Sequence, residues 1–188
     1  MSETQEKTRS QFHIGMRTWK TAFAATLCAF IYFLFNDNPA FACIGAIFGM
    51  GNDMNTSRLG GGNRLFGTII GGVIGMALFR FYIIFHPNGG YYPLMLILLF
   101  IGVVLLILIS QYVKWPGAIQ PGGVMLCIIL FSTPVETYFA YSVNRIFDTC
   151  VGVIVALSVN HWLPRERVYS WLEILNKSAA LYTDRKEY

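Results

Sequence analysis

Two arginines stand in the same short pattern at two places in the chain, and they are the residues best suited to chemistry. Residues 63–71 read NRLFGTIIG and residues 144–152 read NRIFDTCVG. A shared Asn-Arg, Phe, Thr and Gly in one register is more than chance usually gives between apolar segments. A guanidinium is permanently charged and presents a planar fork of donors that fits a carboxylate. Arg64 and Arg145 are therefore the candidate anion-binding residues.

Polar neighbours in the two patterns extend this candidate site. Charge near hydrocarbon tends to face a cavity or a partner, so we expect these side chains to line an anion path. Asp148 lies one turn after Arg145 and either neutralises it or carries a proton. Arg145 is thus either structural or anion-facing, whereas the sequence places no carboxylate beside Arg64. The predicted path comprises Arg64, Arg145, Asn63, Asn144, Thr68, Thr149 and Asp148.

Small residues recur at helical spacing beside each arginine. Such ladders let helices approach closely in lipid, where packing and hydrogen bonds drive association. Helix packing explains them by itself, and a polar strip lining a path is the alternative. The predicted packing positions are Gly67, Gly71, Gly75, Gly152 and Ala156.

The elements that carry these residues are predicted to be membrane helices. Hydrophobic residues make up 55% of the 188-residue chain and charged residues only 13%, against about a quarter charged in soluble domains. The apolar runs predict an all-α membrane protein with six transmembrane helices in a domain over residues 18–163. We expect cytoplasmic amphipathic segments at 1–17 and 164–188, and a polar loop from residue 51 to residue 63. The six predicted spans are 18–35, 39–50, 64–85, 92–110, 117–133 and 145–163.

The repeated pattern predicts an inverted arrangement of two sets of three helices. Three is odd, so the second set would cross the membrane in the opposite sense, as in many secondary transporters. The short runs 39–50 and 117–133 contain Pro39 and Pro121, which we interpret as the broken-helix positions. With both termini in the cytoplasm, every Lys and Arg except Arg80 and Arg145 falls on the inner side. This positive-inside bias is what predicts that both termini are cytoplasmic, and we expect a multi-pass protein of the cell membrane.

The residue patterns that several classes of function require are missing from the sequence. The four cysteines form no CxxC pair, and no cluster of metal-ligand spacing is present. The sequence contains no P-loop and no serine, histidine and carboxylate group that suggests hydrolysis. We therefore expect no enzyme activity, no cofactor, no metal and no nucleic-acid partner.

Three parts of the sequence resemble the aromatic acid exporter family, within the wider fusaric-acid-resistance-like superfamily. They are the opening at residues 14–22, the two Asn-Arg patterns, and the ending Val159-Asn160…Pro164. The resemblance, which extends to plant malate channels, implies a six-helix unit that moves organic anions such as aromatic carboxylates. It also implies a homodimer, with Arg64 and Arg145 as the anion-facing residues.

The leading hypothesis is accordingly a transporter or permease that exports organic anions, either passively or coupled to protons. The alternative is a membrane scaffold or assembly protein in which the repeat only packs.

Overall fold

The computed structural model describes residues 16–163 of the chain, and in this range the regular structure is entirely helical. The predicted helix at 164–188 and most of the predicted segment at 1–17 lie outside the described residues. The elements are α1 (Met16–Leu34), α2 (Ala40–Gly49), α3 (Met54–Phe85), α4 (Pro93–Tyr112), the short 3-10 helix η1 (Pro116–Ala118), α5 (Ile119–Ser132) and α6 (Tyr138–Trp162).

Three of the described helices, α3, α4 and α6, are long and apolar enough to cross a membrane. Helix α1 has 19 residues, but Arg17 and Lys20 in its first turns reduce its apolar character. Helices α2 and α5 have 10 and 14 residues, shorter than the roughly 17–25 that cross the hydrocarbon of a bilayer. The structure therefore supports a multi-helix membrane protein with three clear spans, and the six-span arrangement stays a prediction.

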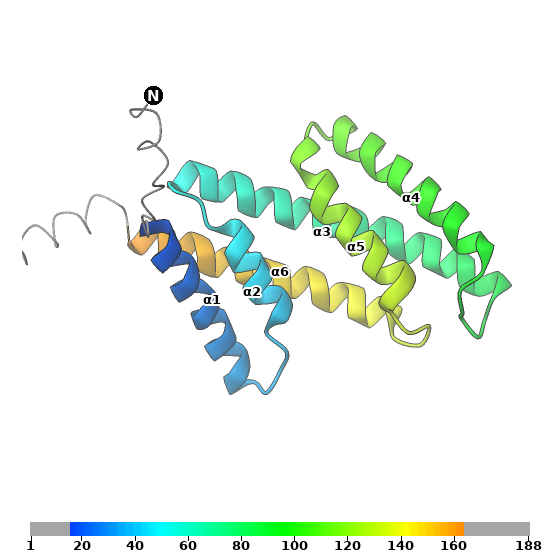
Figure 1. Cartoon of the computed structure of the whole chain (residues 1–188), viewed down its shortest axis with the longest axis horizontal. Coiled ribbons are helices and arrows are strands. Elements are labelled where there is room, and N and C mark those ends of the chain that lie inside the picture. Colours follow the sequence, from blue (N-terminus) through cyan, green and yellow to red (C-terminus); the bar gives the residue numbers. More distant parts are fainter. Residues whose placement is uncertain (1–15, 164–188) are drawn as a thin grey trace, which may run out of the picture.

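Helices α3 and α6 form a central antiparallel pair, and the other helices flank it in two groups (Figure 1). Gly61 of α3 lies against Val153 of α6, whereas Gly72 lies against Ile146, so the two helices run in opposite directions. The short helix α2 packs mainly on α6, and the short helix α5 packs mainly on α3. Helices α1 and α4 complete the two groups. Each half of the chain thus places its short helix against the long helix of the other half.

Helix α3 begins ten residues earlier than the sequence analysis expected, because residues 54–63 are helical and not a loop. Asp53 caps the helix: its carboxylate accepts a bond from the backbone N–H of Thr56, and the Thr56 side chain bonds back to the Asp53 N–H. This reciprocal capping box is a strong helix start. The Thr56 bonds also hold the pKa of Asp53 below its usual value. The three glycines at 60–62 weakened the helical pattern in the sequence.

The predicted small residues lie where helices meet most closely. A Cβ on Gly71 would collide with the backbone of Gly122 in α5, and a Cβ on Gly152 would collide with the backbone of Ala42 in α2. Pro39 is the residue before α2, and Pro121 lies in the first turn of α5. Both prolines therefore lie at the beginnings of short helices, where a missing N–H costs little.

The remaining positions in the predicted packing set lie at the same two interfaces. Gly67 faces Pro121 and Gly122 of α5, and Gly75 faces Ile129 farther along that helix. Ala156 is fully buried, and its Cβ faces Gly49 of α2.

Candidate functional site

Arg64 lines a pocket of about 350 Å³ where α3 meets α2 and the beginning of α5. The guanidinium carbon lies 5.5 Å from the centre of the Phe48 ring, and the Nε atom is buried without a hydrogen-bond partner. Two amide side chains, Asn63 and Gln120, share the lining. Among residues 16–163, no acidic group lies within ion-pair distance of Arg64. The pocket therefore presents a positive charge that nothing in the described structure compensates.

Asn63 is held in place by Trp115, which follows α4 in the chain. The indole Nε1–H donates to the Asn63 side-chain oxygen over 2.7 Å. Because an indole can only donate, the Asn63 amide nitrogen is left as the free donor. The ring of Phe66 lies 4.8 Å from that of Trp115 and supports it. A carboxylate beside Arg64 would thus find a guanidinium and an oriented amide donor on neighbouring positions of one helix.

Arg145 lines a different pocket, of about 530 Å³, between α6 and the end of α1. Its Nη1 lies 3.6 Å from Oδ2 of Asp148, and the two side chains are 14% and 8% exposed. The Tyr32 hydroxyl donates to the other carboxylate oxygen over 2.7 Å. Asn144 and Asp37 also line this pocket. Within the described residues, the second arginine therefore has a counter-ion and the first has none.

The repeated threonines serve their own helices. The Thr68 hydroxyl donates to the carbonyl of Arg64, and the Thr149 hydroxyl donates to the carbonyl of Arg145, both over 2.8 Å. Both threonines are buried. Such i−4 back-bonding occupies the hydroxyl proton. The Thr positions of the pattern thus shape the helices behind the arginines.

The two arginines do not share a pocket in this structure. Each lies in the N-terminal half of its helix, and α3 and α6 are antiparallel. Both arginines lie beside the short helix α2: the Phe41 ring in its first turn contacts Arg145, and the Phe48 ring in its last turn contacts Arg64.

A buried polar network that the sequence analysis did not predict joins three helices. The Lys20 ammonium donates to Asn160 over 3.0 Å, and the Asn160 amide donates to the Ser57 hydroxyl over 2.8 Å. Ser57 in turn accepts from the backbone N–H of Gly51. Lys20 is only 4% exposed. One signal was available: Lys20 shares its helix face with Ala24, Cys28 and Tyr32, a four-residue spacing that places the lysine on the buried stripe.

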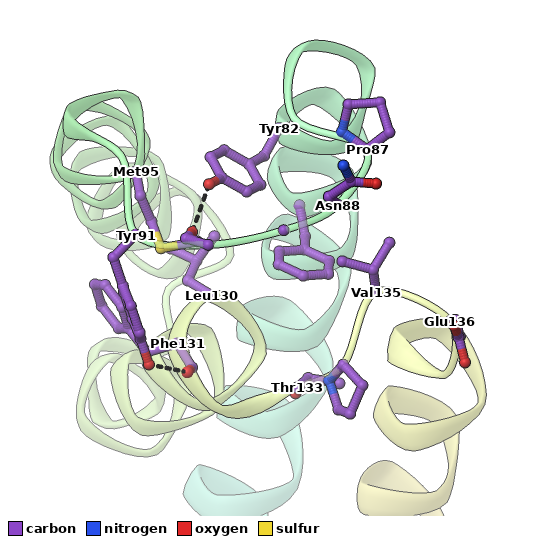
Figure 2. Close-up of a pocket in the computed structure, with 14 residues that line it drawn as sticks. Tyr82, Pro87, Asn88, Tyr91, Met95, Leu130, Phe131, Thr133, Val135 and Glu136 are labelled. Atoms are coloured by element: carbon purple, nitrogen blue, oxygen red, sulfur yellow. Dashed lines mark hydrogen bonds between the residues drawn. The ribbon is translucent and has the colours of Figure 1, made fainter.

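Figure 2 shows a third pocket, of about 590 Å³. Its lining residues come from the ends of α3 and α5 that are farther from the Arg64 pocket. Its walls are largely aromatic and apolar, and its described lining contains no basic side chain. The hydroxyls of Tyr82 and Tyr91 are bonded to the carbonyls of Gly90 and Phe131. The sequence analysis did not single out these residues. With its tyrosine donors occupied and no cation in the described lining, this pocket is a poor anion site.

Comparison with models of protein families gives a match. The family model described as aromatic acid exporter family member 1 matches residues 12–163, which is most of the chain and includes all of the described structure. Neither the curated proteins nor the solved structures contain a significant match.

Proposed function

Because the chain belongs to the aromatic acid exporter family, we propose that it exports organic anions, and aromatic carboxylates in particular, with Arg64 as the primary anion-binding residue. One observation supports this assignment most directly. Arg64 has two amide neighbours and no counter-ion near it among the described residues, whereas Arg145, whose Nε is likewise buried without a hydrogen-bond partner, pairs with Asp148. A charge near hydrocarbon is costly without a function or a partner. The Phe48 ring beside the guanidinium adds an apolar surface for an aromatic substrate.

We propose further that the six helices are two inverted sets of three and that the path runs between them. The reciprocal packing of α2 on α6 and of α5 on α3 supports this arrangement, since a two-fold axis in the membrane plane would exchange these pairs. With the termini in the cytoplasm, Arg64 would serve the inner end of the path and Arg145 the outer end. Relative movement of the two sets would then pass the anion from one arginine to the other. The cell-membrane location and the homodimer are parts of the same proposal.

Flux of radiolabelled benzoate from proteoliposomes tests this function. We expect Arg64→Ala to reduce flux to the level of empty liposomes, because it removes the uncompensated charge. Arg80→Ala is the matched control: it removes an arginine from the same helix at an exposed position outside the three pockets, and flux should persist.

Equal flux from the two variants would reject Arg64 as the anion site. If the purified wild-type protein moved no carboxylate, the scaffold alternative would replace the export proposal. Circular dichroism and size-exclusion chromatography of both variants would establish that each is folded before the fluxes are compared.

A further inference from the structure

The two repeated patterns differ in one position that is polar in only one of them. This difference gives Arg145 an acidic neighbour that Arg64 does not have. The residue three positions after the arginine is Gly67 in the first copy and Asp148 in the second. Gly67 is in close contact with the beginning of α5, so α5 occupies the space that a side chain would need. Asp148 is buried and pairs with Arg145. A buried carboxylate inside a membrane domain is rare and is usually functional.

The Arg145 guanidinium has a second support that does not depend on Asp148. Its central carbon lies 3.9 Å from the centre of the Phe41 ring and 4.6 Å from the centre of the Tyr141 ring. Cation–π contacts of this kind hold an arginine through its ring partners. Neutralising the carboxylate would therefore leave Arg145 in place beside the pocket, in contact with both aromatic rings.

The groups around the ion pair determine the charge that an anion would meet. Tyr32 of α1 and Asp37 of the α1–α2 turn line the pocket, and α2 contributes the neutral Phe41. Next to the ion pair, α3 faces Ile146 of α6 with Gly72, which carries no titratable side chain. With both aspartates ionised, one arginine and two carboxylates give the described lining a net charge of −1. A proton on the buried aspartate raises that charge to zero and removes the competitor for the arginine.

We propose that Asp148 is a proton-operated gate for the second anion site. A proton from water adds to the Asp148 carboxylate, the ion pair breaks, and Arg145 keeps its charge and becomes free to bind a carboxylate or sulfonate that carries an aromatic ring. The proton returns to water when the ion pair re-forms. Tyr32 positions the carboxylate and takes no part in the transfer. In an exporter this gate opens in acid, the condition in which weak aromatic acids enter cells most readily as neutral molecules. The inference rests on the proposed function and adds its regulation.

Binding of naphthalenesulfonate to the full-length protein in nanodiscs tests the gate. A sulfonate keeps its charge between neutral and mildly acidic pH, so any pH dependence reports on the protein. We expect wild-type affinity to rise roughly tenfold on acidification, as the removal of one opposing charge at short range implies. Arg145→Ala should lose this pH-dependent binding, and Arg64→Ala should keep it.

Two variants give the deciding comparison. Asp148→Asn mimics the protonated carboxylate and should bind as tightly at neutral pH as wild type does in acid, with no further pH dependence. Asp37→Asn, at an exposed position of the same pocket, should raise the neutral-pH affinity and leave the pH dependence in place. A wild-type pH profile retained in Asp148→Asn would overturn the proposal, as would the absence of pH-dependent binding in the wild type.

The failure of the gate and the failure of the export proposal are distinguishable. Benzoate flux without pH-dependent sulfonate binding would reject the gate alone. pH-dependent sulfonate binding without flux would uphold the gate and reject export.

Discussion

The Arg64 pocket and the Arg145 pocket arise from the same sequence pattern but present different charges. Arg64 lies beside amides and one aromatic ring, with no acidic partner among the described residues. Arg145 contacts two aromatic rings and pairs with a buried carboxylate that also accepts a hydrogen bond from Tyr32. A repeated motif therefore does not produce a repeated site. The difference depends on the residue at the third position after the arginine and on which helix packs against it.

The largest expected effect concerns Gly67, the position that differs between the two pockets. Gly67→Ala should destabilise the protein by about 1–3 kcal/mol, because the added methyl collides with the Pro121 ring and with backbone of α5. Gly123→Ala is the matched control, since its new Cβ would have only Leu106 nearby, at 3.9 Å. Thermal unfolding of the two purified variants measures the difference. Equal stability would show that α5 does not exclude a side chain from the Arg64 copy.

A second prediction compares the arginines directly by replacing each with lysine. Lysine keeps the charge but loses the bidentate fork. We expect Arg64→Lys to lower benzoate flux at neutral pH roughly tenfold, because this arginine binds the anion throughout. Arg145→Lys should change neutral-pH flux much less, since Asp148 already compensates that charge. The opposite order of the two effects would reverse the assignment of the primary site.

The smallest expected effect concerns the rings around Arg145. Phe41→Leu removes the closer cation–π contact and should weaken sulfonate binding in acid by roughly two- to fivefold. Phe33→Leu makes the same change at a position of α1 where the side chain is 77% exposed, and it should have no effect. Titrations of both variants in mildly acidic buffer give the comparison. Equal affinities would mean that Asp148 alone positions Arg145.

Much of this architecture follows from the sequence. The apolar runs and scarce charges predicted a helical membrane protein, and the resemblance to aromatic acid exporters is confirmed by the family match over residues 12–163. Both arginines could be identified from the sequence, because an arginine is unusual in an apolar segment and this one occurs twice in the same pattern. The start of α3 was predicted too late, because three consecutive glycines obscured a helix that the Asp53 capping box begins.

The partners of these residues were decided by the tertiary structure. Local sequence patterns indicate where each helix lies in the chain and which of its faces is apolar. They do not specify which distant helix packs on that face. From the sequence, Lys20 was only one of the basic residues of the cytoplasmic side. In the structure its ammonium is buried and donates to Asn160 of α6, which in turn donates to Ser57 of α3. Likewise, the sequence left open whether Asp148 pairs with Arg145, and the packing of α1 and α2 on α6 placed Tyr32 and Phe41 around that pair. The sequence by itself thus determined that the protein carries two arginines in membrane helices. It also placed an acidic residue near only one of them, and long-range packing then decided how deeply each arginine is buried and which side chains contact it.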